Sequence, residues 1–365
     1  MGKKERLAKI LMQSWVERLL VQKKRRHLSI LAYHSVQEFT QDYPYNAENI
    51  SAYPNVFAEQ MDFVSKHFNV INFYDLVRYQ SAYPNLLFPQ LLKLLPPNSM
   101  IITFDDGYAD NLNIALPIMK SYGLTGVVYI STDFVDQQKL FWFDEVARCM
   151  QVLPEGPINI FNNRFSVHLN DTNREKQRRA FGRFLQTLTD NERLEAIEEL
   201  RHISQYNFDS CKFSCGMPLS WEQVRQLRSE GIEIGSHTRN HGFLDVMNEE
   251  ELLDQIAGSK EQIESQIGES IVSFSYPNGN FHQGVVDTYK NVHCASFFDK
   301  FMGIVVRPDN LLVTFIGGQL CWIKLSCVVT TCFGITNTTV CCSRIGFFDQ
   351  NFHLSGKIRP RWSTC

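Results

Sequence analysis

The chain lacks long hydrophobic runs and lacks an excess of charge of either sign. No segment approaches the roughly 18 consecutive apolar residues of a membrane-spanning helix, so we expect no transmembrane helix. The 36 Lys and Arg residues almost balance the 39 Asp and Glu residues, and the formal net charge is −3. This balance gives no general reason to expect a nucleic-acid partner.

Cysteines are scarce over most of the chain. Only Cys149, Cys211 and Cys215 precede residue 290, whereas the rest of the 10 cysteines crowd the last fifth of the sequence. A disulfide framework would need cysteines throughout the fold, and the spaced CxxC pairs of a structural zinc site are absent. We therefore expect reduced thiols and assign the cysteines no metal-binding role.

Internal repeats and low-complexity tracts are also absent. A chain of 365 residues with 44% hydrophobic content can bury one large core, and domains of this size include α/β barrels. We expect one main domain over residues 28–290, interrupted by an insertion over residues 135–217. Charged sequence of helical character, at residues 173–180 and 191–202, predicts that this insertion is helical and caps the main domain.

The two ends of the chain differ from the main domain. A basic amphipathic helix is predicted over residues 1–27 from apolar residues at helical spacing, which are Leu7, Ile10, Leu11, Trp15, Leu19 and Leu20. Such a helix can make a peripheral contact with an anionic membrane, although its apolar stripe more often packs on its own domain. Residues 291–365 form an atypical Cys-rich tail without Glu. This tail either completes the barrel in part, which we favour, or is divergent sequence that closes it poorly.

Apolar runs alternate with segments of helical periodicity, which is typical of βα units around a largely parallel sheet. Strands are expected at Leu28–Tyr33, Met100–Phe104, Gly126–Ile130, Ile232–Ile234 and Ile271–Phe274. Helices are expected at residues 57–68, from Asn111 to Gly123, and after the N-cap pairs Ser220 with Gln223 and Asn248 with Glu251.

Polar residues follow several of these strands. His34 follows the first strand, Asp105 and Asp106 follow the second, and His237 follows the fourth. Because the carboxyl ends of parallel strands gather on one face of a barrel, we expect these side chains to converge.

Two imidazoles and one carboxylate can hold a first-row metal ion, and a second carboxylate beside them completes a site for hydrolysing an amide or ester. Asp105, Asp106, His237 and His241 offer this set. Each motif can also have a structural role without any chemistry. Asp-Asp-Gly can form a simple turn, because Asp and Gly tolerate the backbone angles of turns. The two histidines can be surface residues one helical turn apart, and they lack the Glu of zinc-protease helices. The combination is more specific than either part, because both motifs follow apolar strands.

These motifs resemble those of the polysaccharide deacetylases with a NodB-homology domain, carbohydrate esterase family 4. The resemblance covers about residues 30–289 and is carried by Tyr33-His34-Ser35, Thr103 to Tyr108, Ser236 to His241 and Phe274 to Gly279. It implies a distorted (β/α) barrel. It also implies that Asp105 is the catalytic base and that Asp106, His237 and His241 bind a divalent metal, Zn²⁺ before Co²⁺ or Ni²⁺.

The resemblance further implies an activity. Asp105 would take a proton from metal-activated water, which attacks an N-acetyl or O-acetyl group of a carbohydrate polymer or glycoconjugate, such as a chitooligosaccharide. A backbone N–H of the loop Tyr276, Pro277, Asn278 and Gly279 would stabilise the oxyanion. The expected enzyme cleaves carbon–nitrogen bonds of N-acetylated sugars and not peptide bonds.

The chain departs from the family pattern at two places. Ser275 stands where the family often has an Arg that orients the base, and a late Asp-Trp motif and a final general-acid His have no convincing match. His282, His293 and His353 are candidates for that acid by residue type only. These departures keep open a catalytically weak carbohydrate-binding module on the same fold and, less favoured, a metal-dependent phosphoesterase.

The place of action is an expectation from the same resemblance. The family often acts on envelope polymers, whereas the N-terminal residues of this chain lack the uninterrupted apolar core of a signal peptide. We therefore expect a bacterial protein that is cytoplasmic or associated with the inner membrane.

Overall fold

The computed structural model describes residues 28–38, 46, 49–86, 88–206, 216–279, 281–293, 311–316, 319–324 and 346–347. The helix predicted over residues 1–27 lies outside these ranges. The strands are β1 (Leu28–Tyr33), β2 (Ser35–Val36), β3 (Ile50–Ala52), β4 (Asn69–Val70), β5 (Ser99–Phe104), β6 (Val127–Ile130), β7 (Gly156–Ile160), β8 (Phe165–Leu169), β9 (Glu233–Ser236), β10 (Leu311–Ile316), β11 (Gln319–Lys324) and β12 (Gly346–Phe347).

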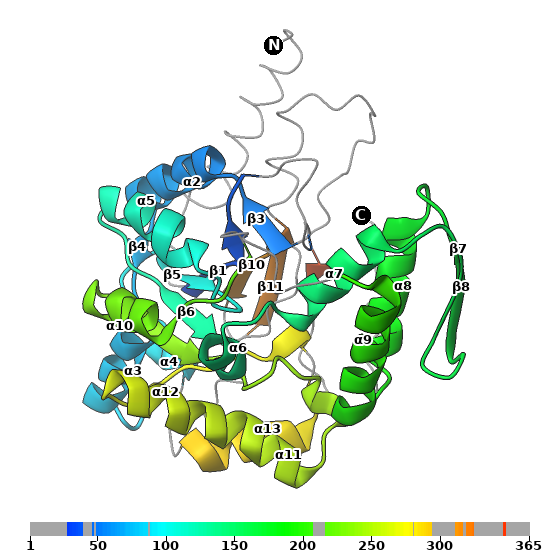
Figure 1. The fold of residues 1–365 in the computed structure, drawn as a ribbon. Coiled ribbons are helices and arrows are strands. Elements are labelled where there is room, and N and C mark those ends of the chain that lie inside the picture. Colours follow the sequence, from blue (N-terminus) through cyan, green and yellow to red (C-terminus); the bar gives the residue numbers. More distant parts are fainter. Residues whose placement is uncertain are drawn as a thin grey trace, which may run out of the picture.

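Most helices lie around the main sheet in Figure 1, whereas those of residues 142–204 stand to one side of it together with a β-hairpin. The α-helices are α2 (Pro54–His67), α3 (Phe73–Ala82), α4 (Phe88–Leu91), α5 (Leu116–Ser121), α6 (Thr132–Gln137), α7 (Trp142–Val152), α8 (Arg174–Leu185), α9 (Asp190–Ser204), α10 (Trp221–Ser229), α11 (Glu249–Leu253), α12 (Ser259–Ile267) and α13 (Gln283–His293). Two π-helical turns, η2 (Asn111–Ala115) and η5 (Asp254–Gly258), and two 3₁₀ turns, η4 (Leu244–Val246) and η6 (Pro277–Gly279), complete the described elements.

The main sheet has the order β12-β11-β10-β1-β5-β6-β9, and β4 also pairs with β5. Strands β1, β5, β6 and β9 are parallel, as are β4 and β5. The predicted α/β fold with a parallel sheet is therefore confirmed, whereas closure into a barrel stays a prediction. The tail adds antiparallel strands, because β10 pairs with β1, and β11 and β12 follow it outward.

Side chains of the parallel strands alternate between two hydrophobic clusters, one on each face of the sheet. Ile30 on β1, Ile101 on β5 and Tyr129 on β6 belong to one cluster, and their neighbours in sequence belong to the other. The strands β1, β5, β6 and β9 are buried along their whole length. Burial on both faces explains why β1, β5 and β6 read as largely apolar runs in the sequence, whereas β9 also carries the buried polar residues Glu233 and Ser236.

Some predicted boundaries changed. Phe274 makes only an isolated parallel bridge with Ser236, so the strand predicted at Ile271–Phe274 is wrong as a regular strand. The helix predicted from Asn111 begins as the π-turn η2, continues as α5, and is followed by Gly123 with a φ of 67°. The predicted N-caps are confirmed, since Ser220 and Asn248 both form capping boxes.

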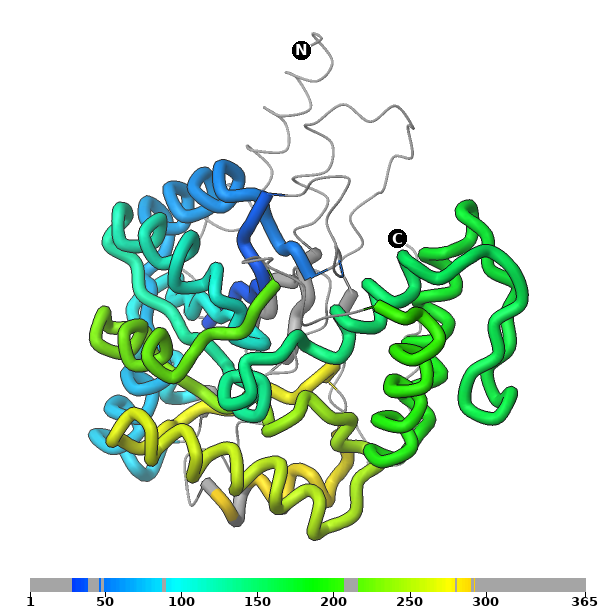
Figure 2. Tube along the Cα trace, in the orientation of Figure 1, coloured from blue at the N-terminus to red at the C-terminus, as the bar shows by residue number. Residues whose placement is uncertain are grey.

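The insertion, residues 135–217, contains the helices α7, α8 and α9 and the antiparallel hairpin β7–β8. The insertion is mainly helical, as we predicted, but the hairpin was not foreseen from the sequence. We did not predict the hairpin because each of its strands has only five residues. Its turn also depends on backbone conformation, with positive φ angles at Phe161, Asn162 and Asn163. A separate hydrophobic cluster fills the insertion, which stands beside the main domain in Figure 2.

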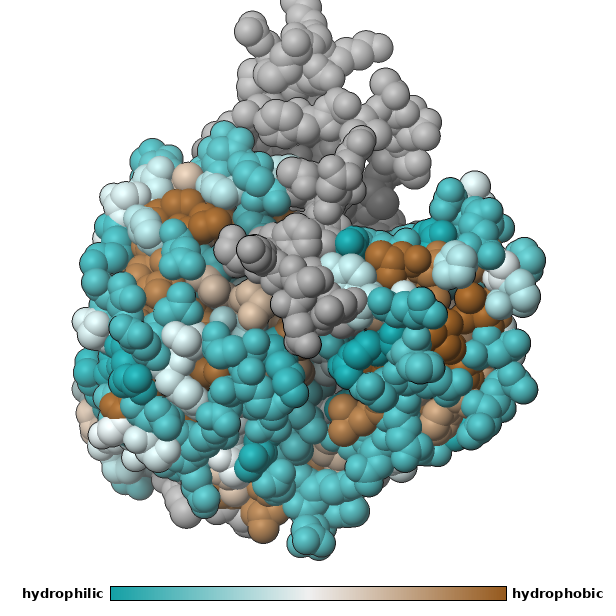
Figure 3. Space-filling view, in the orientation of Figure 1, coloured by the Kyte–Doolittle hydropathy of each residue, from teal (hydrophilic) through white to brown (hydrophobic). Residues whose placement is uncertain are grey.

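The surface seen in Figure 3 is mostly hydrophilic, and its apolar side chains lie in separate patches. No helix in the described part of the chain is long and apolar enough to cross a membrane.

One buried carboxylate ties the first residue of β9 to helix α3. Glu233 Oε2 accepts hydrogen bonds from the backbone N–H groups of Phe73 at 2.8 Å and Tyr74 at 3.2 Å, which are the first two amides of α3. Its Oε1 accepts a hydrogen bond from Ser273 Oγ at 2.7 Å. Helix-start amides have no partner within the helix, so Glu233 satisfies two of them. Burial raises the pKa of Glu233 to about 7.

We expect Glu233→Ala to lower the free energy of unfolding by about 2–3 kcal/mol, because it leaves helix-start amides without an acceptor. Glu233→Gln keeps an acceptor oxygen and serves as the control.

Because folding raises the pKa of Glu233, the folded state binds an extra proton between the ordinary value of about 4.3 and the folded value. The unaltered protein should therefore lose stability relative to Glu233→Gln as the pH rises from about 4.3 to about 7, with no further loss above that range. Urea unfolding at several pH values measures this, and an identical pH dependence in both proteins would contradict it.

Candidate functional site

The candidate site lies where the parallel strands end. The register of β1 and β5 pairs Tyr33 with Phe104, and the next amide, Asp105 N–H, donates to Tyr33 O at 2.8 Å. His34 and Asp105 therefore leave neighbouring strands side by side. His237 follows β9, and its N–H donates to Ile130 O of β6 at 2.9 Å. The strand order thus brings residues from distant parts of the sequence to one end of the sheet.

The Asp-Asp-Gly segment is both a turn and part of this site. Asp106 has a φ of 72° and Gly107 a φ of 82°, both in the left-handed region. A Cβ atom at Gly107 would lie 2.7 Å from Ile130 Cγ2, so the close approach to β6 requires glycine. The two interpretations of this motif from the sequence are therefore compatible.

Asp106, His237 and His241 converge in the interior. Asp106 Oδ1 lies 3.5 Å from His237 Nε2 and 3.3 Å from His241 Nε2, and the three side chains are buried. One ligand atom from each residue lies within 4.8 Å of the others. Asp106 Oδ1 has no hydrogen-bond partner in the described structure. An orphaned carboxylate oxygen between two imidazoles fits a divalent metal ion of the zinc class.

The two histidines are oriented in different ways. His237 Nδ1 lies 2.8 Å from the carbonyl oxygen of Ser275, so a proton on Nδ1 would be donated there and Nε2 would face Asp106 as an acceptor. Metal-binding histidines usually make such a second hydrogen bond. His241 Nδ1 is buried and has no hydrogen-bond partner among the described residues.

Burial and mutual charge set the pKa values of this group. Burial alone would raise the pKa of Asp106, but the adjacent His237 and His241 imidazoles outweigh it and hold that pKa well below its ordinary value. Burial raises the pKa of Asp105, against the lowering effects of the His237 and His34 charges. The neighbouring carboxylates overcome the effect of burial on His237 and raise its pKa, whereas burial lowers the pKa of His241.

Ser275 contacts Asp105 directly. Its Oγ donates a hydrogen bond to Asp105 Oδ2 at 3.3 Å, and both residues are buried. Asp105 Oδ1 has no hydrogen-bond partner in the part of the chain that the structure describes. The family that this chain resembles often has an Arg at this position. Here the hydroxyl of Ser275 contacts the carboxylate of Asp105 instead.

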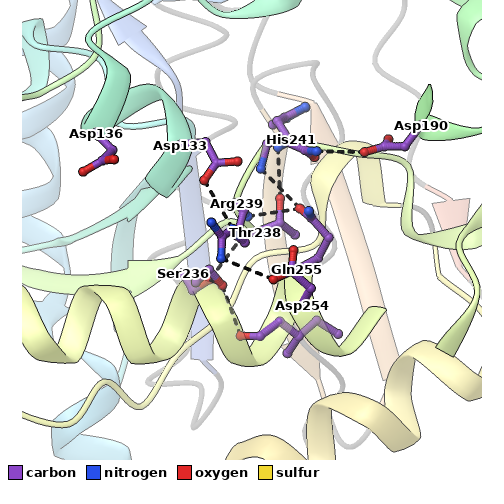
Figure 4. A network of polar contacts seen from close by, with 12 residues as sticks. Asp133, Asp136, Asp190, Ser236, Thr238, Arg239, His241, Asp254 and Gln255 are labelled. Carbon is purple, nitrogen blue, oxygen red and sulfur yellow. Dashed lines mark hydrogen bonds and ion pairs between the residues drawn. The ribbon is translucent and has the colours of Figure 1, made fainter. Parts of the chain in front are cut away.

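The segment between the two histidines is a strained loop and not a helix. Thr238 has a φ of 68° and His241 a φ of 53°, conformations that a β-branched or bulky residue rarely adopts. Side chains accept hydrogen bonds from the backbone N–H groups of this loop. Gln255 Oε1 accepts from Arg239 N–H and Asn240 N–H. Thr238 Oγ1 accepts from His241 N–H. Figure 4 shows Gln255 reaching this loop from η5. Both histidines are buried, so the interpretation as surface histidines is wrong.

The residues expected to form an oxyanion loop begin beside the site. Pro277, Asn278 and Gly279 form η6, where Asn278 has a φ of 56° and Gly279 N–H donates to Tyr276 O at 3.0 Å. Asn278 Nδ2 is buried and has no partner among the described residues. The ring of Tyr276 is fully buried against Phe281 and Phe274, so its ring belongs to the core.

The histidines considered for a general acid differ in position. His282 is exposed, and its Nδ1 accepts the N–H of Gly284 at 3.1 Å. His353 lies outside the described residues. His34, which the sequence placed after the first strand without a role, is half-buried, and a positive charge on its ring would lower the pKa of both Asp105 and Asp106. The sequence signal for His34 is its place directly after the first strand, within Tyr33-His34-Ser35, and the register of β1 and β5 then places it beside Asp105.

Sequence comparison with curated proteins finds no match. Three solved structures are similar in fold. Streptococcus pyogenes deacetylase PplD in complex with acetate is 14% identical with a TM-score of 0.46, over 73% of this chain and 80% of that chain. A de-N-acetylase from Aggregatibacter actinomycetemcomitans is 18% identical with a TM-score of 0.44, over 73% and 85%. The BpsB deacetylase domain from Bordetella bronchiseptica is 14% identical with a TM-score of 0.41, over 78% and 91%.

The sequence itself matches a known family over more than half of its length. The profile of the polysaccharide deacetylase family covers residues 93–295. This range includes the Asp-Asp-Gly turn, the strained histidine loop and Ser275. The chain belongs to the polysaccharide deacetylase family and is a carbohydrate deacetylase, a hydrolase of amide bonds.

Proposed function

We propose that this protein is a metal-dependent deacetylase that removes N-acetyl groups from a sugar polymer or glycoconjugate. The observation that carries the proposal is the convergence of Asp106, His237 and His241, buried beside a second carboxylate, Asp105. The metal ligands we propose are these three residues, and zinc is the ion we favour because two imidazoles and a carboxylate suit it. A bound ion of this kind supplies Lewis acidity and lowers the pKa of water towards about 7.

Asp105 is the base in this proposal. It lies next to Asp106 and is held by Ser275 Oγ, and burial raises its pKa towards the range in which a carboxylate accepts a proton readily. Asp105 takes a proton from water, the water oxygen bonds to the acetyl carbon, and the C–N bond breaks. The products are acetate and a free amine on the sugar. We place the oxyanion donor on the backbone of the segment Tyr276 to Gly279, which begins beside Ser275.

The leaving amine needs a proton, and we infer that His34 donates it. His34 and Asp105 follow paired residues of neighbouring strands, because Tyr33 is in register with Phe104. Asn111 Nδ2 donates to the carbonyl oxygen of His34 at 2.8 Å, which fixes this corner of the backbone. His282, by contrast, is exposed, and its Nδ1 accepts a hydrogen bond from the neighbouring Gly284 N–H.

Acetate release from N-acetylglucosamine oligomers tests the activity directly. We expect zinc-loaded protein to release acetate, and we expect chelation to abolish the release. Asp105→Asn should lower kcat by about 100-fold or more, because the amide cannot accept the proton. A folded, zinc-binding protein that binds the sugar without turnover would instead favour the carbohydrate-binding module.

Metal binding has a readout that does not need substrate. Zinc at roughly 100 times its Kd should raise the free energy of unfolding by about 2.7 kcal/mol, because only the folded chain assembles the three ligands. Asp106→Asn should remove most of this gain, whereas Asp105→Asn should retain it. Thermal unfolding with and without zinc measures the difference. Equal zinc stabilisation in both variants would contradict the ligand assignment.

The proton donor is tested by comparing two histidine variants. We expect His34→Asn to lower kcat on N-acetylated oligomers by about 100-fold, because general acid catalysis contributes on that order. An activated acetyl ester, whose leaving group needs no proton, should be hydrolysed by His34→Asn at nearly the unaltered rate. His282→Asn is the matched control and should behave as the unaltered protein on both substrates. A loss that is equal on the amide and the activated ester would contradict the role of His34.

A further inference from the structure

The insertion touches the loop that carries His241 at two points. Trp142 Nε1, on the first residue of α7, donates to the carbonyl oxygen of His241 at 3.2 Å. Asp190, on the first residue of α9, accepts a hydrogen bond from Asn240 Nδ2 at 2.7 Å. Figure 4 shows Asp190 approaching the loop from the side opposite Asp133 and Asp254. Two helices of the insertion thus hold two adjacent residues of the loop.

The ring of His241 also rests on the insertion. The Phe143 ring lies 5.1 Å from it at an interplanar angle of 68°, and the Trp142 ring lies 6.3 Å away. His241 Nδ1 has no hydrogen-bond partner among the described residues, in contrast to His237, whose Nδ1 contacts Ser275 O. His237 is therefore oriented by a polar partner on the main domain, whereas His241 is oriented by aromatic packing from the insertion.

A buried arginine joins these contacts. Arg193 of α9 is 1% exposed, and its guanidinium lies 5.4 Å from the Trp142 ring centre and 5.3 Å from that of Phe243. Its Nη2 lies 2.7 Å from Asp190 Oδ1. The same aspartate thus pairs with Arg193 through one oxygen and with Asn240 through the other. The guanidinium is thus attracted to the faces of both rings, which are in contact with each other.

We propose that the insertion positions His241 as a metal ligand, through Trp142 and Phe143 on α7 and through Asp190 on α9. This inference rests on the proposed metal role of His241. The loop needs external support because Thr238 and His241 hold left-handed backbone conformations, which persist only where surrounding contacts fix them. Trp142, Asp190 and Arg193 act through His241 and its loop, so they are positioning residues.

Zinc affinity of the full-length protein, measured by competition with a chromophoric chelator, tests the proposal. Trp142→Phe removes the indole N–H but keeps an aromatic ring, and Asn240→Ala removes the contact to Asp190 while leaving the Asp190–Arg193 pair in place. We expect each to raise the Kd for zinc by about tenfold or more, the effect typical of losing a partner that orients a ligand. The absorption spectrum of the Co²⁺-loaded variants should also change, because it reports the geometry of the ligands.

Glu145→Gln is the matched control. Glu145 of α7 pairs with Arg201 of α9 at 2.8 Å and 2.9 Å, so this variant weakens the same insertion without touching the histidine loop. It should lower Tm and leave the Kd for zinc unchanged. Zinc affinities of Trp142→Phe and Asn240→Ala within about twofold of the unaltered protein would overturn the proposal, as would an equal loss in Glu145→Gln. Absence of zinc binding by the unaltered protein would overturn the proposed function and this inference together.

Discussion

The carboxylate of Asp106 lies between two imidazoles in a region almost closed to water, and much of the surrounding structure is arranged to hold these groups there. Burying an ionised carboxylate is costly unless opposite charges or hydrogen bonds compensate it. His237 and His241 supply that compensation and depress the pKa of Asp106 despite its burial. The two imidazoles can compensate the buried carboxylate only if other groups hold each ring in place. The carbonyl of Ser275 fixes one, and the aromatic rings of the insertion pack against the other.

Backbone strain is concentrated around the same group. Asp106, Thr238 and His241 all have positive φ angles, and Gly107 allows the turn to pass within van der Waals contact of Ile130. Strained residues of this kind persist where their neighbours over-determine them. Here Gln255 satisfies two consecutive amides of the histidine loop from the π-turn η5. Stability elsewhere in the fold therefore maintains a geometry that the local sequence disfavours.

The residues that converge could be predicted because strand ends are easy to recognise. The bounds of β1 match the predicted Leu28–Tyr33, and polar residues directly after buried runs had to meet at one edge of a parallel sheet. Three-dimensional neighbours without a local motif could not be predicted. An example is Trp142, whose contact with the backbone of His241 depends on how the insertion packs. The bridge at Phe274 was mistaken for a strand because apolar composition does not reveal how many ladder bonds form.

The two ends of β9 carry residues with different roles: Glu233 at the first end stabilises the fold, and His237 just beyond the other end belongs to the candidate site. At its first residue, Glu233 caps α3 and is buried away from any of the candidate ligands, so its hydrogen bonds serve the fold. Just beyond its last residue, His237 begins the strained loop, and the adjacent Ser236 makes hydrogen bonds with Ser273 and Ser275 on the next segment. Strand β9 is only four residues long. Hydrogen bonds that fix Glu233 at its first residue therefore also help to fix the position of His237 just beyond its last residue. The insertion likewise contacts the histidine loop, because Trp142 Nε1 donates to His241 O and Asn240 Nδ2 donates to Asp190.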